Sequence, residues 1–391
     1  MEHFYHGNRV QLLLNGDGYF PALIGAIEQA VHSIYLETYI FELDDSGTQV
    51  ADVLEQAALR GVQTHVLIDG FGARSFPADR LRRMIESGMR VLFFRPELSL
   101  FSLKRQRLRR LHRKIAVIDG RQAFVGGINI VDDRNTPHQV APRYDYAVRV
   151  EGPLLGAIHH AVRQMWWHAC WAQFKQHWLP VPALPPDVSD HGDMEAAFVV
   201  RDNLRHRKAI ETAYLRAIGH ARREIFIANA YFLPGRTFRR ALLDASHRGV
   251  RVVVLLQGRV EYLLMHFATR TLYRRLLAGG VEIWEYRKSF MHAKVAVVDG
   301  VWATVGSSNI DPFSLLLARE ANVLVRDSRF AGELRADLLK SMQEASVRIE
   351  FDHIRRHGPL RRFLPWLAYG MVRLMMGITG YGRREYAESE E

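Results

Sequence analysis

The sequence predicts an α/β fold built from two pseudo-symmetric, fused α/β sandwich repeats, and three observations support this. Short apolar stretches alternate with longer stretches of helical periodicity. The same order of stretches occurs twice in the 391 residues. Each copy also contains nearly the same motif, "LHRKIAVIDGRQAFVGGINI" at 111–130 and "MHAKVAVVDGVWATVGSSNI" at 291–310. The length itself is typical of two domains or two fused halves.

In the first half, strands and helices are expected to alternate. This order implies βαβ crossovers and a largely parallel sheet with helices outside it. After the motif another strand is expected at Tyr144–Val150, followed by an aromatic-rich helix. The expected order before the motif is strand Ser33–Phe41, helix Gly47–Arg60, strand Gly61–Asp69, helix Ala78–Gly88 and a strand at 89–94.

The second half repeats this order at nearly constant spacing. Glu224–Phe232 matches the first strand at an offset of 191, Arg248–Gly258 matches the second at 188, and Gly280–Tyr286 matches the third at 192. The motifs match at 180, because the first half carries twelve extra residues just before its motif. A strand at Arg319–Val325 again follows the motif.

These matches divide the chain into four expected parts. The first repeat spans 1–178 and the second spans 196–350. A proline-rich linker at 179–195 joins them. The last part, 351–391, is expected to be a basic amphipathic tail.

Composition restricts the classes of function. Hydrophobic residues make up 48% of the chain, which is enough for a folded core. The formal net charge is +11, which favours polyanionic partners such as nucleic acid or an anionic membrane. A single cysteine, Cys170, excludes an intrachain disulfide and a multi-cysteine zinc site. The first residues lack the layout of a signal peptide, and no apolar run of about 20 residues predicts a transmembrane helix.

The repeated motif predicts phosphoryl chemistry. Residues two apart on a strand share a face, so His112 points with Lys114, and His292 points with Lys294. A lysine ammonium cannot bind a metal, but it neutralises a phosphoryl oxygen. Histidine beside it offers a nucleophile or a proton carrier near neutral pH.

Two-fold pseudosymmetry would bring both motifs to one site. One histidine could then attack phosphorus while the other protonates the leaving oxygen. Asn129 and Asn309, at identical spacing after the motif histidines, could donate to the same oxygens. A single His-x-Lys would carry no information, and pure structural duplication remains the alternative for the pair.

At these residues the chain resembles the phospholipase D superfamily, whose signature is this duplicated His-Lys-Asp motif. The resemblance extends from about Asn15 to Arg348. Within the superfamily, the first motif and "RYDYAVRVEGP" (143–153) look most like bacterial cardiolipin synthases of the shorter type without N-terminal membrane spans. The resemblance implies the phospholipase D fold, with the active site at the interface of the repeats.

The resemblance also implies roles for individual residues. His112 would be the nucleophile, and His292 would be first general acid and then general base. Asp145 and Glu320 match positions that orient the imidazoles. Ser307 stands where the first motif has Gly127, and no metal or cofactor is required. The residues expected to hold phosphoryl oxygens are Lys114, Lys294, Asn129 and Asn309, and the motif carboxylates Asp119 and Asp299 are expected to be structural.

The implied reaction is transfer of a phosphatidyl group between two phosphatidylglycerol molecules through a phosphatidyl-histidine, with release of glycerol. Water competes with the lipid alcohol for this intermediate, so a phospholipase D-type hydrolase or another phosphatidyltransferase is the alternative. A phosphodiesterase acting on nucleic acid is a third possibility, because the same chemistry serves both substrates.

Two segments favour a lipid partner over nucleic acid. The twelve extra residues belong to "RPELSLFSLKRQRLRRL", which puts cations beside aliphatic residues. Such a segment suits docking on an anionic bilayer, although a solvated basic helix is the plain alternative. The tail at 360–384 is apolar and basic at both ends, and it is expected to lie in the membrane interface or to cover the core. The protein is therefore expected on the cytoplasmic face of a bacterial inner membrane, held there by Lys104, Arg105, Arg107, Arg109 and Arg110.

Overall fold

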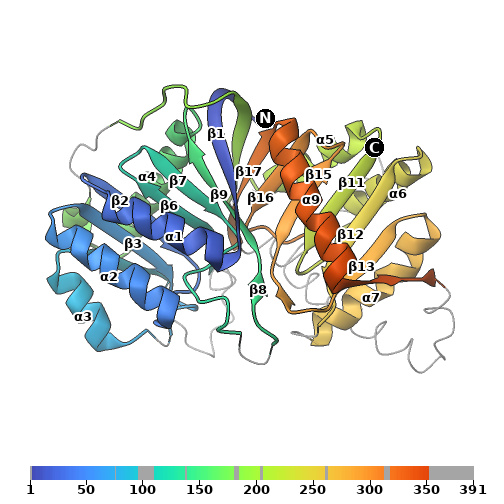
Figure 1. Ribbon diagram of the computed structural model, residues 1–391. Helices are drawn as coiled ribbons and strands as arrows, with labels where there is room; N and C mark the ends of the chain where they lie inside the picture. Colours follow the sequence, from blue (N-terminus) through green and yellow to red (C-terminus); the bar gives the residue numbers. More distant parts are fainter. Residues whose placement is uncertain are drawn as a thin grey trace.

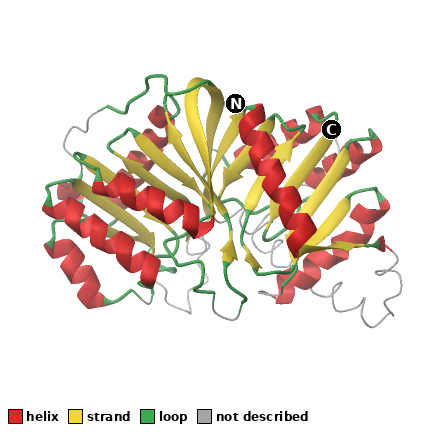
Figure 2. Cartoon of the chain, viewed as in Figure 1, coloured by secondary structure: helices red, strands yellow, loops and turns green. Residues whose placement is uncertain are grey.

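The structure is a computed structural model that describes residues 2–74, 76–95, 110–136, 139–179, 185–202, 206–259, 263–311 and 318–351. Two similar halves lie side by side, with the first half in blue and green and the second in yellow to red (Figure 1). Helices cover both faces of the strands in each half (Figure 2). The basic residues Lys104, Arg105, Arg107 and Arg109 and the tail from 352 onward lie outside the described residues.

The strands of both halves follow the same spatial order. Outward from the junction, the first half runs β1-β9-β7-β6-β2-β3-β4 and the second runs β10-β17-β16-β15-β11-β12-β13, with β18 added at its edge. The two runs meet where β1 pairs antiparallel with β10, so they form one continuous sheet. First-half strands are β1 (Tyr5–Leu14), β2 (Ser33–Thr38), β3 (Gln63–Asp69), β4 (Arg90–Phe94), β6 (Lys114–Ile118), β7 (Gln122–Gly126) and β9 (Tyr146–Glu151). Second-half strands are β10 (Met194–Arg201), β11 (Glu224–Asn229), β12 (Arg251–Gln257), β13 (Glu282–Tyr286), β15 (Lys294–Val298), β16 (Trp302–Gly306), β17 (Ala318–Arg326) and β18 (Ser346–Ile349).

The expectation of a largely parallel sheet was wrong. Among the longer strands that the structure describes, the parallel pairs are confined to the outer ones, β2-β3-β4 and β11-β12-β13, which helical crossovers connect. The motif strands β6 and β7 form an antiparallel hairpin joined by only three residues, 119–121, in which Asp119 and Gly120 both have positive φ. Asp299 and Gly300 repeat this turn between β15 and β16. So short a connection can join only antiparallel neighbours, because a parallel pair needs a long crossover.

Sequence reasoning also missed the two strands at the junction, β1 and β10. Both carry polar and apolar residues in an irregular pattern, and each pairs with one strand from its own half and one from the other. One sheet runs through both halves, so the strands themselves do not mark where one repeat ends and the other begins. The limits expected for the two repeats and for the linker therefore stay a prediction.

The helices follow the predicted crossovers closely. Asp44 caps α2, where its carboxylate accepts a hydrogen bond from Gly47 N at 3.0 Å, and Asp327 caps α9 by accepting from Phe330 N at 2.8 Å. The described part of α7 buries Ala268, Leu272 and Leu276, so the apolar face of this helix belongs to the core. The helices are α1 (Asn15–Glu28), α2 (Asp45–Leu59), α3 (Ala78–Glu86), α4 (Leu155–Ala172), the 3-10 turn η2 (Gln176–Trp178), α5 (Ala209–His220), α6 (Arg236–His247), α7 (Leu263–Ala278) and α9 (Ser328–Ala345).

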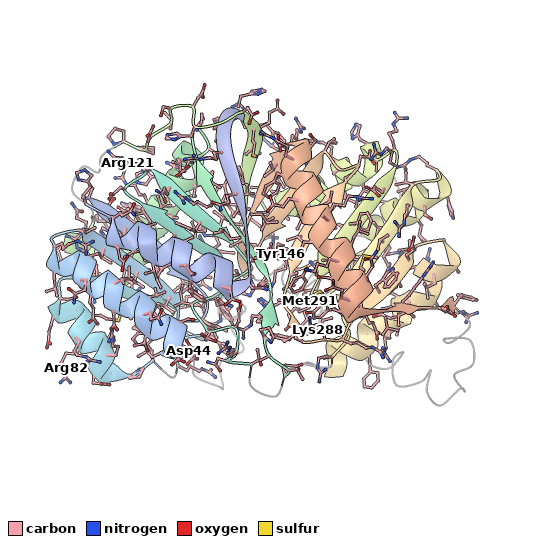
Figure 3. All side chains as sticks on the ribbon, viewed as in Figure 1. Asp44, Arg82, Arg121, Tyr146, Lys288 and Met291 are labelled. Atoms are coloured by element: carbon pink, nitrogen blue, oxygen red, sulfur yellow. The ribbon has the colours of Figure 1, made fainter. Side chains whose placement is uncertain are left out.

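One core joins the halves, and two others lie under the outer helices. The shared core combines β-strand side chains of both halves with α4 and α9. Tyr146 and Met291, each fully buried, mark this junction (Figure 3). Within the described residues, no helix has both the length and the apolar character needed to cross a bilayer.

Candidate active site

Each motif histidine is anchored on the opposite half of the molecule. The short strand β5 (Arg110–Leu111) pairs in parallel with the start of β17, and His112 N then donates to Arg319 O at 3.0 Å. In the same way, β14 (Phe290–Met291) pairs in parallel with β8 (Arg143–Tyr144), and His292 N donates to Tyr144 O at 2.8 Å. This exchange places both motifs at the junction.

The carboxylates that hold the imidazoles are exchanged too. Nδ1 of His112 lies 3.0 Å from Glu320 Oε2, and Nδ1 of His292 lies 2.6 Å from Asp145 Oδ2. Both carboxylates are buried, at 0% and 1% side-chain exposure, so each ring is held firmly. A ring that donates from Nδ1 keeps Nε2 as the nitrogen available for chemistry.

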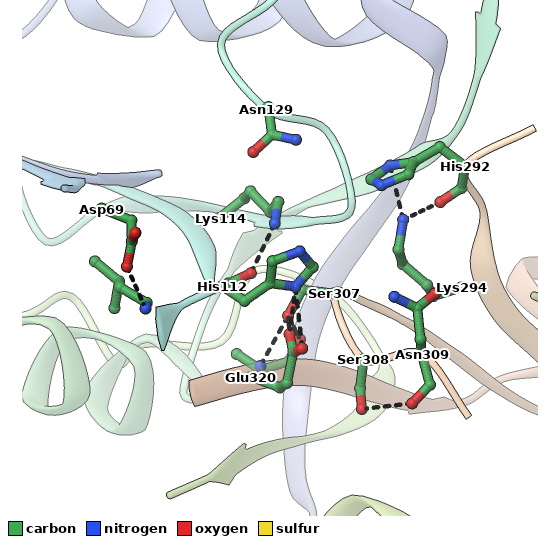
Figure 4. Close-up of polar contacts among 12 residues, drawn as sticks. Asp69, His112, Lys114, Asn129, His292, Lys294, Ser307, Ser308, Asn309 and Glu320 are labelled. Atoms are coloured by element: carbon green, nitrogen blue, oxygen red, sulfur yellow. Dashed lines mark hydrogen bonds and ion pairs between the residues drawn. The ribbon is translucent and has the colours of Figure 1, made fainter. Parts of the chain in front are cut away.

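The lysines and asparagines gather around the same centre (Figure 4). Lys114 and Lys294 are buried, and Lys114 Nζ donates to His112 O at 2.8 Å. Lys294 Nζ donates to His292 O and lies 3.6 Å from Asp145. Asn129 Oδ1 accepts from Ile40 N at 3.1 Å, which fixes the orientation of its amide. The centre therefore holds cations and amides from both halves.

Burial and repulsion between like charges lower the pKa values of the lysines and histidines at this centre. Burial lowers the pKa of Lys114 to about 7 and that of Lys294 to about 8, and Lys294 adds to the shift on Lys114. Burial, with Lys294, also lowers the pKa of His292 to about 3, against the opposing effect of Asp145. The pKa of His112 is lowered by burial in the same direction, although Glu320 opposes the shift. An anion placed here would reverse these shifts, because it would stabilise each protonated form.

The lysine pKa values predict how activity depends on pH. Both lysines carry their charge below about pH 7 and lose it as the pH rises past about 8, so attraction for an anionic phosphodiester is lost over that range. We expect kcat/KM to fall on the alkaline side, by up to about tenfold for each pH unit and each lysine. Initial rates between pH 5.5 and 9.5 would check this. A kcat/KM that stays constant to pH 9.5 would contradict it.

The structure explains the one difference between the motifs at the glycine position. A Cβ built on Gly127 would lie 2.3 Å from Asp145 Oδ1, so this residue cannot carry a side chain. In the second motif, Ser307 Oγ donates to Glu320 Oε2 at 2.5 Å and accepts from Ala321 N at 3.1 Å. The Ser307 hydroxyl therefore orients the carboxylate, and it is committed there rather than to a phosphate.

The motif aspartates lie away from this centre, at the other ends of β6 and β15. Asp119 accepts hydrogen bonds from the backbone N–H groups of Val31, His32 and Ser33 at 2.8–2.9 Å. Asp299 repeats the arrangement with the N–H groups of 222, 223 and 224 at 2.7–3.0 Å. Burial raises the pKa of Asp299, but these N–H groups outweigh it and hold the pKa below its usual value. Both carboxylates fasten the hairpin turn to the start of the neighbouring strand.

We therefore expect Asp119→Ala to act on stability rather than on chemistry. Three donors lose their acceptor, which should reduce the free energy of unfolding by about 1–3 kcal/mol. Urea denaturation measures this change, and kcat of the folded protein should stay within about threefold of the parent, since the carboxylate touches no reacting atom. Unchanged stability with a large loss of kcat would show that the residue is catalytic.

Sequence reasoning missed two residues of the site. Tyr39, just after β2, has its ring centre 4.9 Å from that of His112. Asp69, at the end of β3, is fully buried and accepts from Leu111 N at 2.8 Å, which fixes β5. Their position at the carboxyl ends of parallel strands, where sites form in such sheets, is the signal that could have found both.

Not all cations near the first motif are available to a membrane. Arg113, just after that basic segment, is 5% exposed and donates to buried Glu37 at 2.7 and 2.8 Å. Arg110 was predicted to bind the membrane, but it turns inward to Asp69 at 3.5 Å and its side chain is only 15% exposed. Their partners are buried acidic residues far away in sequence, which the local charge pattern does not reveal.

Among the described residues, no group of three or more histidine, cysteine or acidic side chains is arranged to hold a metal ion.

Comparison with known proteins identifies the family. The model of the PLD-like domain of cardiolipin synthases matches twice, at residues 23–166 and 214–342. Cardiolipin synthase B of Escherichia coli (strain K12) is 40% identical over 341 residues, which cover 85% of this chain and 80% of that protein. Cardiolipin synthase 1 of Bacillus cereus is 29% identical over 362 residues, which cover 90% of this chain and 70% of that protein.

Solved structures share the fold at low identity. Phosphatidylserine synthase of Haemophilus influenzae Rd KW20 superimposes with a TM-score of 0.69 at 13% identity, covering 95% of both chains. Polyphosphate kinase of Porphyromonas gingivalis gives a TM-score of 0.59 at 16% identity and covers 88% of this chain and 49% of that one. The two-repeat fold predicted from the sequence is thereby confirmed. The chain belongs to the cardiolipin synthases, a family of phosphatidyltransferases in the phospholipase D superfamily.

Proposed function

We propose that this protein makes cardiolipin from two molecules of phosphatidylglycerol. The observation that carries the proposal is the exchange of parts across the junction, in which each half supplies the carboxylate that holds the imidazole of the other. With family membership at 40% identity, this arrangement supports a single site that uses both histidines.

In the first step, Nε2 of His112 attacks the phosphorus of phosphatidylglycerol. The P–N bond forms, the P–O bond to glycerol breaks, and His292 gives its proton to the glycerol oxygen. The pKa of His292 is about 3 in the empty site, so the negative charge of the bound phosphodiester is needed to favour the proton on this ring. Lys114, Lys294, Asn129 and Asn309 stabilise the charge on the phosphoryl oxygens.

In the second step, the roles reverse. A hydroxyl of the second phosphatidylglycerol gives its proton to His292 and its oxygen bonds to phosphorus, while the bond to His112 breaks. Cardiolipin leaves, and both rings return to their starting states. The carboxylates Asp145 and Glu320 keep the rings in place throughout, and Ser307 holds Glu320.

The direct test is mass spectrometry of the products that the purified full chain forms from vesicles of phosphatidylglycerol, alone and mixed with phosphatidylethanolamine. We expect cardiolipin and free glycerol in equal amounts. Phosphatidic acid as the sole lipid product would instead make the protein a hydrolase. No lipid turnover, with cleavage of single-stranded DNA, would favour a nucleic-acid phosphodiesterase.

We further propose that the protein binds peripherally to the anionic cytoplasmic face of a bacterial inner membrane. The net charge of +11 supports this, because cations are attracted to an anionic surface. Each cation near the surface adds up to about 1 kcal/mol to the binding free energy. Flotation with phosphatidylglycerol vesicles tests it. Changing Lys104, Arg105, Arg107 and Arg109 to Gln should release the protein. The matched control changes four exposed arginines elsewhere, Arg82, Arg121, Arg240 and Arg274, and equal loss in both variants would exclude a local docking segment.

A further inference from the structure

A stack of aromatic rings leads from the surface to His112. The Phe71 side chain is 44% exposed. Its ring stacks on Tyr39, with centres 6.3 Å apart and planes 10° apart. The Tyr39 ring in turn lies 4.9 Å from the His112 ring, tilted by 59°. Two aromatic side chains therefore connect the outside of the protein to the nucleophilic imidazole.

Cations border this stack at both ends. The Arg74 guanidinium lies 4.5 Å from the centre of the Phe71 ring, and that of Arg110 lies 5.7 Å from it. Next to the site, Lys114 Nζ lies 5.3 Å from the centre of the Tyr39 ring. Apolar rings with positive charge beside them suit a phospholipid, which combines acyl chains with a phosphate.

The second half has no aromatic pair at the corresponding positions. At the offsets of 191 and 188, Tyr39 corresponds to Ala230 and Phe71 to Arg259. The isolated bridges Phe41–Ile130 and Phe232–Ile310 confirm the offset of 191 at this point of the fold. The pseudosymmetry is therefore broken on the side of His112, where the covalent intermediate would form.

We propose that Tyr39 and Phe71 form a wall that holds the glycerol backbone and acyl chains of the donor lipid over His112 and keeps water away from the phosphatidyl-histidine. The proposal rests on the function proposed above. Once the P–N bond has formed, either a lipid alcohol or water can give its oxygen to phosphorus and its proton to His292 as that bond breaks. The alcohol yields cardiolipin and water yields phosphatidic acid, so the wall determines the ratio of the two products.

The experiment measures this ratio. Purified wild type, Tyr39→Ala, Tyr39→Phe and Phe71→Ala are incubated with phosphatidylglycerol vesicles, and both lipids are quantified by mass spectrometry. The matched control is Phe174→Ala, which removes another exposed phenylalanine, 85% exposed, after α4. Circular dichroism and the melting temperature confirm folding. Tyr39→Phe keeps the ring, so it still tests the proposal if the alanine variant misfolds.

We expect Tyr39→Ala to raise the ratio of phosphatidic acid to cardiolipin roughly three- to tenfold, and Tyr39→Phe to leave it near the wild-type value. Phe71→Ala should raise the KM for phosphatidylglycerol, and Phe174→Ala should change neither quantity. Slower turnover of a folded Tyr39→Ala at an unchanged ratio would overturn the wall. If Tyr39→Ala does not fold, Tyr39→Phe decides the question. Because Tyr39→Phe keeps the ring, a raised ratio in this variant would overturn the wall too. A wild type that makes no cardiolipin would overturn the proposed function itself.

Discussion

His112→Ala and His292→Ala should each reduce cardiolipin formation on the order of 10⁴-fold or more, with the fold intact. Groups that act as a unit lose nearly all their effect when either is removed, because one ring forms the bond to phosphorus and the other moves the proton. The measurement is the initial rate of cardiolipin formation from phosphatidylglycerol vesicles. Turnover within tenfold of the parent by either variant would refute the two-histidine scheme.

A substrate that needs no acid separates the roles of the two histidines. The p-nitrophenyl ester of phosphatidic acid releases a stable anion, so the first step with it does not require a proton from His292. We expect His292→Ala to give one equivalent of p-nitrophenol in a burst, with the phosphatidyl group on the peptide that contains His112. His112→Ala should give no burst. The reverse pattern would make His292 the nucleophile.

Glu320→Gln and Asp145→Asn should each lower kcat by roughly 10²–10⁴-fold, and each should impair the histidine of the opposite half. Glu320 holds Nδ1 of His112 at 3.0 Å, so its loss misorients the nucleophile. Asp145 raises the pKa of His292, so its removal lowers that pKa further and leaves less of the protonated general acid. Each effect follows from the loss of one buried carboxylate.

The same burst experiment distinguishes the two carboxylates. Glu320→Gln should slow the burst with the p-nitrophenyl ester, whereas Asp145→Asn should preserve it and slow only later turnover. The pairing crosses the molecule, since Asp145 lies in the half that carries His112. If Asp145→Asn abolished the burst and Glu320→Gln spared it, each carboxylate would serve its own half and the crossed arrangement would be wrong.

The motif residues that the sequence singled out lie together at the junction (Figure 4), whereas the expected direction of most strands in the sheet was wrong. Duplication of the motif at a constant offset gave both histidines, both lysines and both asparagines, because chemistry requires those residue types at fixed spacing. The family resemblance, rather than the duplication, pointed to Asp145 and Glu320. The crossed contacts were not predictable, because β5 and β14 are two residues long and leave no periodic pattern.

Errors about the sheet and the surface have physical causes as well. Alternation of strands and helices is the pattern of a parallel sheet, and it dominated the prediction although the hairpin turns at Asp119 and Asp299 reverse the chain. Arg110 and Arg113 looked like surface cations, but buried Asp69 and Glu37 lie 41 and 76 residues away in sequence and draw them inward. Tertiary contacts of this kind override local charge patterns.

The central claim is that imidazoles from both halves act on one phosphorus atom. A crystal structure of the protein with vanadate, which imitates the five-coordinate phosphorus of the transition state, tests it directly. We predict one vanadium bonded to Nε2 of one histidine, with the opposite axial oxygen about 2.6–3.2 Å from Nε2 of the other. Vanadate bound to one ring, with the second ring beyond the reach of any of its oxygens, would contradict the account.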